Sequence, residues 1–128
     1  MDGCTNITNN ITIEGQSVNQ MNFSNMTNLR KLYIQNCTGI TSDIDLTGCA
    51  EIREVDASGT TINVTVPTGA KLTKYELGTP TAVNLTNPTV LTPAQVVVDH
   101  SANITSLDLI NIPNNKSFTM FDKITTTV

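Results

Sequence analysis

The chain lacks tryptophan, and only three phenylalanines and two tyrosines stand among its 128 residues. A globular core of this size usually holds more bulky side chains, so we expect a thin core of leucine, isoleucine and valine. Threonine and asparagine are abundant instead, with 22 and 15 copies. Threonine is β-branched and suits strands, whereas asparagine suits tight turns. The composition therefore predicts an all-β or mostly β chain.

Charge is sparse as well. Only 14% of the residues are charged, the formal net charge is −4 and the pI is near 4.6. A nucleic-acid partner requires a basic face that neutralises phosphates, so this balance argues against nucleic acid. No apolar run is long enough to enter a membrane, and the start, MDGCTNITNN, lacks the basic and apolar parts of a signal peptide. By its length the chain is a single domain spanning residues 1–128.

Apolar residues recur in a first series of strand-like segments. The segments begin at Leu29, Ile52, Leu72 and Leu91, with spacings of 23, 20 and 19 residues, and follow the pattern L-x-x-L-x-L. An earlier segment contains Ile11 and Ile13. The residues expected in the interior are Leu29, Leu32, Ile34, Ile52, Val55, Leu72, Tyr75, Leu77 and Leu91.

A second series of alternating segments lies between the first. It covers residues 43–46, 63–66, 82–85 and 106–109, with an earlier member ending at Phe23. Each segment up to 82–85 ends six residues before the next segment of the first series begins, and the middle residue of each turn is expected to face inward. Those middle residues are Met26, Cys49, Gly69 and Pro88. A turn of constant length indicates stacked coils, because stacked coils must superpose there.

The C-terminal tail breaks this pattern. It holds Phe118, Met120 and Phe121, and bulky residues gathered at one end suit a cap over the last coil. The final residues, KITTTV, are expected to form an edge strand. Exposed edges pair readily with another chain, so self-association through this strand or through the coil ends is a further expectation.

The segment LRKLYIQNCTGI, residues 29–40, resembles the cysteine-containing variant of the leucine-rich repeat. Cys37 occupies the Asn/Cys position and Ile40 closes the signature, whereas later coils place Thr60, Pro80 and Asp99 at that position. The resemblance implies a short leucine-rich-repeat-like solenoid of about four to five coils, with two strand columns and a C-terminal cap.

Residues 29–109 are also similar in style to degenerate repeats of surface and tail proteins from gut Bacteroidetes and their phages. This second resemblance implies an adhesion or tail-associated role on a cell or virion surface. It also implies that the chain is a piece of a longer solenoid.

The residues that carry chemistry do not form a catalytic set. The only histidine, His100, has Asp99 and Ser101 as neighbours, and consecutive strand residues point to opposite faces. Asp43 and Asp45 are candidates for a hard cation, but a solvated strand face is the favoured interpretation. A β-helical carbohydrate-active enzyme needs two facing acids, and no such pair is found. We therefore expect no enzyme, no metal and no cofactor.

The three cysteines, Cys4, Cys37 and Cys49, show no CxxC spacing, which argues against a zinc site or a disulfide framework. In the coil arrangement Cys37 and Cys49 fall at opposite ends of the cross-section, too far apart for a disulfide. Both are expected to be buried thiols, and Cys4 is the more exposed one.

The outward face of the first strand series is the candidate binding surface. Proteins with leucine-rich repeats bind through this face, so the resemblance implies a protein or glycan partner. The candidate residues are Arg30, Lys31, Tyr33, Gln35, Arg53, Glu54, Asp56, Lys74 and Glu76. One hypothesis is therefore a non-enzymatic recognition or adhesion module. The alternative is a structural spacer or tail segment, in which Lys31, Glu54 and Lys74 form a self-neutralising ladder.

Overall fold

The computed structural model describes residues 10–12, 22–23, 26–86, 96–99, 102–110, 117–121 and 124–127. Every regular element in these ranges is a strand, and none of them contains a helix, so the mostly β prediction is confirmed. Within the same ranges there is accordingly no helix of the length and apolarity that a membrane span requires.

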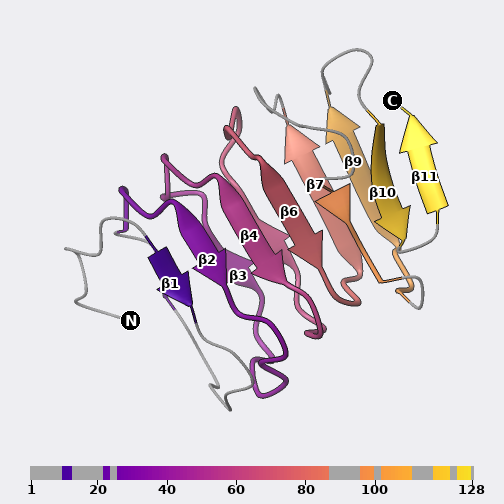
Figure 1. Cartoon of the computed structure of the whole chain (residues 1–128), viewed down its shortest axis with the longest axis horizontal. Coiled ribbons are helices and arrows are strands. Elements are labelled where there is room, and N and C mark those ends of the chain that lie inside the picture. The colour runs from indigo at the N-terminus through magenta and orange to yellow at the C-terminus, as the bar shows by residue number, and fades with distance from the viewer. Residues whose placement is uncertain are drawn as a thin grey trace.

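The main sheet is parallel and has five strands in the order β1-β2-β4-β6-β8 (Figure 1). Its strands are β1 (Asn10–Thr12), β2 (Lys31–Tyr33), β4 (Glu54–Ala57), β6 (Lys74–Leu77) and β8 (Val96–Val97). Lys31 lies opposite Glu54, and Glu54 lies opposite Lys74, which are the offsets that Leu29, Ile52 and Leu72 predict. Equivalent residues of successive strands therefore stand side by side.

The remaining parallel strands form the layer behind the main sheet in Figure 1. They are β3 (Ile44–Asp45), β5 (Val64–Thr65), β7 (Ala82–Thr86) and β9 (Ser106–Ile110), and they pair as β3-β5 and β7-β9. β3 and β5 lie within segments of the predicted second series, and β7 and β9 extend one residue past the end of theirs. The chain thus alternates between a front and a rear layer of short strands.

A hairpin of β10 (Ser117–Phe121) and β11 (Ile124–Thr127) follows, with the two strands antiparallel. The predicted C-terminal strand is therefore present, and its partner is β10. The Cα atoms of β10 approach those of β8 to within 8 Å, at the last strand of the main sheet. For Phe118, Met120 and Phe121 the structure describes the strand but not the side chains, so their capping role stays a prediction.

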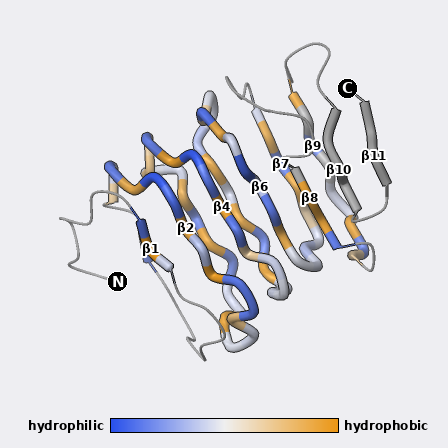
Figure 2. Tube along the Cα trace, in the orientation of Figure 1, coloured by the Kyte–Doolittle hydropathy of each residue, from blue (hydrophilic) through white to orange (hydrophobic). Residues whose placement is uncertain are grey.

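The core lies between the two layers. Eight of the nine predicted interior residues are at most 2% exposed, and the ninth, Leu91, lies outside the described residues. The rear layer completes the core with Ile44, Leu46, Val64, Val66, Val83 and Leu85. Figure 2 shows the resulting alternation of hydrophilic and hydrophobic residues along the strands. Ile11 of β1 is buried and pairs with Leu32, as the earlier segment predicts, and Ile13 lies outside the described residues.

Two turns that lead from the rear to the front layer share one hydrogen-bond pattern. The N–H of Met26 donates to Phe23 and that of Leu29 to Met26, just as Cys49 donates to Leu46 and Ile52 to Cys49. Met26 and Cys49 are buried, as expected.

The third turn differs. Ala70, not Gly69, is its buried residue, so the prediction for Gly69 is wrong. The backbone of Gly69 has a φ of 76°, which glycine adopts without strain, and this conformation moves the inward position one residue along. Pro88 lies outside the described residues.

The fourth segment of the first series is also displaced from the prediction. A segment that starts at Leu91 would place Ala94 opposite Tyr75, whereas Val96 pairs with Tyr75. The fourth segment therefore starts two residues later than Leu91. A shift of two residues keeps the same side chains facing inward, so the alternating pattern did not reveal it.

Polar side chains join the layers and the repeats. The hydroxyl of the buried Tyr75 donates to the carbonyl of Val64 on β5 at 2.6 Å, which links front and rear. On the rear face, the Asn63 amide oxygen accepts from the N–H groups of Thr81 and Ala82, at 2.9 and 3.1 Å. The Asn63 N–H in turn donates to Asp43. These bonds connect the segments that hold Asp43, Asn63 and Thr81, which follow one another along the rear layer.

Candidate binding face

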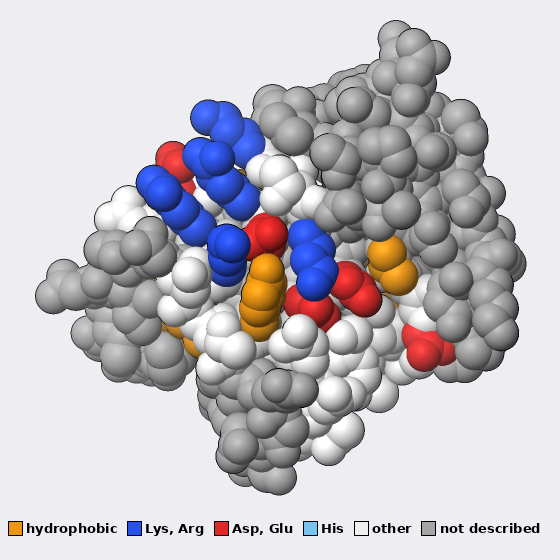
Figure 3. Space-filling model, viewed as in Figure 1, with side chains coloured by type: hydrophobic (Ala, Val, Ile, Leu, Met, Phe, Trp, Pro, Cys, Tyr) orange, Lys and Arg blue, Asp and Glu red, His pale blue; other side chains and the backbone are white. Residues whose placement is uncertain are grey.

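The predicted binding face is the outward side of β2, β4 and β6. Figure 3 views the molecule from this side, and Lys and Arg side chains gather along one edge of it. Five lysines and arginines among the described residues belong to this face and its edge. They are Arg30, Lys31, Arg53, Lys71 and Lys74.

Glu54 is the first centre of the face. It lies 2.7 Å from the Lys31 amine and accepts a hydrogen bond from the Tyr33 hydroxyl at 3.0 Å. The bond from Lys31 holds the pKa of Glu54 below its ordinary value, and the same bond raises the pKa of Lys31. Burial, together with the bond to Glu54, raises the pKa of Tyr33. All three groups are therefore fixed in one charge state near neutral pH.

Asp56 is the second centre. It accepts from Gln35 at 2.9 Å and from the amine of Lys74 at 2.8 Å, and its other oxygen accepts from the N–H and hydroxyl of Ser58. Burial raises the pKa of Asp56, but the bonds from Lys74 and Ser58 outweigh it and hold the pKa below its ordinary value.

Asp56 was predicted to be exposed on the binding face, and this prediction is wrong. It points outward by alternation, yet it is only 3% exposed. The long side chains of Gln35 and Lys74 converge on it from both neighbouring strands. A ligand on this face therefore meets those two residues and not the carboxylate.

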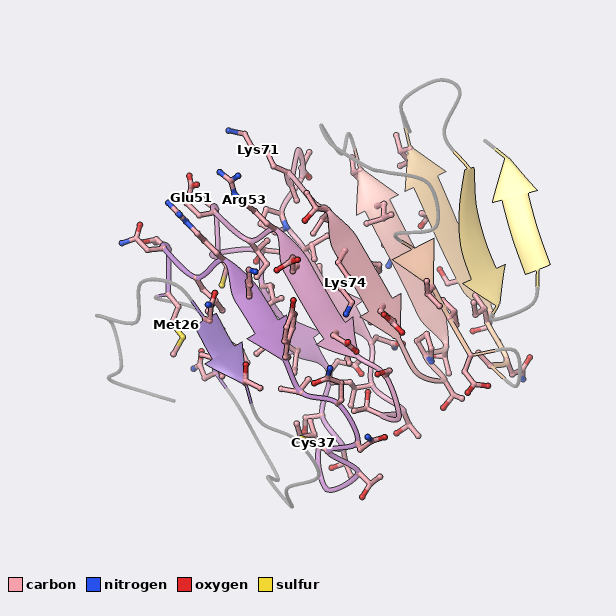
Figure 4. The ribbon with its side chains drawn as sticks, viewed as in Figure 1. Met26, Cys37, Glu51, Arg53, Lys71 and Lys74 are labelled. Atoms are coloured by element: carbon pink, nitrogen blue, oxygen red, sulfur yellow. The ribbon has the colours of Figure 1, made fainter. Side chains whose placement is uncertain are left out.

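Lys74 does not complete the predicted straight ladder. It pairs diagonally with Asp56 on β4 at 2.8 Å and lies 3.6 Å from Glu76 on its own strand, whereas the ladder placed it on Glu54. Its amine lies 5.1 Å from the centre of the Tyr33 ring. The bond to Asp56 raises the pKa of Lys74. The middle of the face is thus an internally paired network, as Figure 4 shows for Lys74 over the sheet.

The edge where the front strands begin has a different character. Arg30 and Lys71 are exposed and have no acidic partner within 4 Å among the described residues. Arg53 lies 3.8 Å from Glu51, and both side chains are more than 40% exposed. Figure 4 shows Lys71, Arg53 and Glu51 together at this edge. We call Arg30, Arg53 and Lys71 the basic edge.

A hollow of about 410 Å³ opens beside the basic edge. Every residue that lines it is polar, and they come from β1, β2 and β4 and from the segments that lead into β2, β4 and β6. The lining residues are Asn10, Arg30, Lys31, Arg53, Glu54 and Thr73. Four of these six were predicted as binding-face residues.

Sequence reasoning missed Asn10 and Lys71, whereas Thr73 follows from the alternation that places it on the outward face. Lys71 sits in the turn before Leu72, where no strand pattern marks it as part of the face. The spacing could have revealed Lys71. It lies three residues before Lys74, just as Glu51 lies three residues before Glu54, and Lys74 and Glu54 are paired on neighbouring strands.

The acidic residues that were considered as cation ligands accept hydrogen bonds from nearby residues instead. Asp45 accepts from the N–H and hydroxyl of Thr47, and Asp43 accepts from Asn63. No group of three or more potential metal ligands occurs in the part of the chain that the structure describes. Asp99 is exposed and its N–H donates to Gly78, whereas His100 and Ser101 lie outside the described residues.

Cys37 and Cys49 are both buried thiols, as expected. Burial raises the pKa of Cys49 to about 11, so this thiol stays protonated at neutral pH. Cys4 lies outside the described residues.

Comparison with known proteins found no matching family model, no matching curated protein and no matching solved structure. The function is therefore argued from the chemistry of the face itself.

Proposed function

We propose that the chain is a non-enzymatic recognition or adhesion module that presents the face of its main sheet to a protein or glycan. Its architecture in this proposal is a short leucine-rich-repeat-like solenoid. The in-register parallel strands and the matching turns at Met26 and Cys49 support that architecture.

The observation that carries the proposal is the basic edge. The chain has a net charge of −4, yet three exposed cations gather at one edge of the main sheet, and among the described residues only one of them, Arg53, has an acid within 4 Å. Exposed charges of one sign that gather beside a hollow attract a ligand of the opposite sign. The charged side chains in the middle of the face bond to one another and leave few groups for a ligand. We therefore propose that the ligand contacts only the basic edge and its hollow, and not all nine predicted residues.

A second candidate function is a structural spacer in a surface fibre or tail. The paired network around Glu54 and Asp56 favours it, because charges that neutralise one another within the chain leave little for a partner. In both proposals the location is a cell or virion surface.

A binding screen separates these two functions. The immobilised full chain is probed with a glycan array and with host-surface protein extracts, beside the triple variant Arg30→Ala, Tyr33→Phe, Arg53→Ala. The matched control is Asn84→Ala, an exposed residue of β7 on the rear layer. We expect specific binding that the triple variant loses and the control keeps. A profile with no ligand, or one that the triple variant leaves unchanged, contradicts recognition through this face.

A further inference from the structure

We infer that Arg30 and Arg53, with the polar hollow beside them, bind the anionic groups of an acidic polysaccharide. This inference rests on the proposed recognition function and names its ligand class. The basic edge would be the subsite for the carboxylate or sulfate group, and the hollow would hold the sugar hydroxyls.

The first reason is the position of the two arginines. The Arg53 N–H donates to the Arg30 carbonyl at 2.8 Å, so the backbone holds these residues directly side by side. Like charges on neighbouring strands repel and reduce stability. One residue further along, Lys31 meets Glu54 and the charges are opposite. An anion bound between Arg30 and Arg53 would remove the repulsion that the fold leaves in place.

The second reason is the state of the guanidinium groups. Arg30 has no acidic partner within 4 Å among the described residues, and the 3.8 Å between Arg53 and Glu51 is longer than a hydrogen bond. Within the described part of the chain, both groups therefore keep N–H donors that no acidic side chain engages. A guanidinium presents its donors in a planar fork that matches carboxylate or sulfate oxygens, so two adjacent forks suit a single anionic group.

The third reason favours a saccharide over an acidic peptide. The hollow offers the Asn10 amide, the Thr73 hydroxyl and the Glu54 carboxylate, and no apolar side chain lines it. Protein interfaces are anchored by buried aromatic or aliphatic side chains, and this hollow has no pocket for them. Closely spaced donors and acceptors instead match the hydroxyl groups of a sugar.

The fourth reason favours a polymer over a single sugar. Arg30 and Arg53 directly precede the neighbouring strands β2 and β4, and Lys71 stands in the turn that leads toward β6. The cations therefore follow the stacking direction of the sheet, in which neighbouring strands lie about 4.8 Å apart. A polysaccharide with repeated charges can lie along this line and engage more than one cation.

The test uses the full chain in isothermal titration calorimetry with four polymers: polygalacturonate, dextran sulfate, neutral dextran and poly-glutamate. We expect binding to polygalacturonate, dextran sulfate or both, none to neutral dextran, and weaker affinity as salt rises. Because each charge-assisted contact contributes on the order of tenfold in affinity, the loss of both in Arg30→Ala with Arg53→Ala should cost about a hundredfold. Arg30→Lys with Arg53→Lys should lose less, and Asn84→Ala nothing.

The four polymers separate the possible outcomes. Carboxylated and sulfated polymers distinguish the two sources of anionic charge, and loss of either signal in the double alanine variant supports the inference. Binding that this variant retains overturns it, as does stronger binding to poly-glutamate, which indicates an acidic protein partner. If none of the four binds but the broad screen finds another ligand, the inference fails and the recognition function survives. Both arginines are exposed, so circular dichroism should show an unchanged fold in each variant.

Discussion

The amine of Lys74 lies 2.8 Å from a carboxylate oxygen of Asp56, whose side chain is only 5% exposed on the neighbouring strand. An acid this covered remains charged because Lys74, Gln35 and Ser58 all donate to it. The pair therefore fixes β4 against β6 on the outer side of the sheet, opposite the apolar contacts of the core.

Removing the cation of this pair should destabilise the fold. Lys74→Met keeps the length of the side chain but leaves a covered carboxylate without its cation, and we expect a loss of about 2 kcal/mol. Urea unfolding followed by circular dichroism measures it. Asp56→Asn in the Lys74→Met background should recover part of the loss. Equal stability of Lys74→Met and wild type would show that the pair contributes nothing.

Acid should weaken the protein through Glu54 and Asp56. Their pKa values are held below the ordinary 4.5 and 3.8, so their contribution is fully present above about pH 4.5 and is lost as the pH falls through the lowered values. Urea midpoints between pH 2 and pH 7 should fall on the acid side. Asp56→Asn should lower stability at neutral pH and flatten that slope, and an unchanged slope contradicts the assignment.

Cys37 and Cys49 should resist alkylation in the folded protein. Both thiols are buried, and burial raises the pKa of Cys49 to about 11, which leaves little reactive thiolate at pH 8. A Cys4→Ser variant limits the readout to these two thiols. Mass spectrometry after iodoacetamide treatment should find neither modified in buffer and both modified in urea. Rapid native labelling of Cys49 would place it outside the core.

Gly59 should not tolerate a side chain. Its φ is 74°, and an added Cβ would collide with the amide oxygen of Asn36. We expect Gly59→Ala to cost about 1–2 kcal/mol or more in urea unfolding. Gly48→Ala is the matched control, because Gly48 is exposed and has no positive φ. Asn36 itself has a φ of 58°, so Asn36→Gly is made alone and in the Gly59→Ala background, and its extra gain in that background is the part of the loss that comes from the collision.

Alternation along the chain was enough to predict which side of each strand faces the core. Leu32, Val55 and Tyr75 are buried and paired as expected, because a one-residue slip would expose all three. The same rule could not locate the start of the last segment. Residues 96–98 are three consecutive valines, and they fit an alternating pattern in more than one register.

The candidate face was predicted in outline but not in its contacts. The alternating pattern predicts that the Asp56 side chain points outward. Its exposure, however, depends on how the side chains of Gln35 and Lys74 bend across the strands to cover it. Lys74 prefers Asp56 to Glu54 because Lys31 and Tyr33 already occupy the latter. The basic edge depends on a turn residue, Lys71, that no strand pattern marks. Which side chains pair with one another depends on their positions in three dimensions, which the alternating pattern does not give.

The placement of the two tyrosines gives the molecule its own optical probes. With no tryptophan in the chain, ultraviolet-excited emission arises from Tyr33 on the outer face and Tyr75 in the core. Tyr33 donates to a carboxylate beside the hollow, so its emission should respond to a ligand there. Tyr75 responds only when the two layers separate. A Tyr33→Phe variant would therefore report unfolding alone, and comparison with wild type would report occupancy of the face.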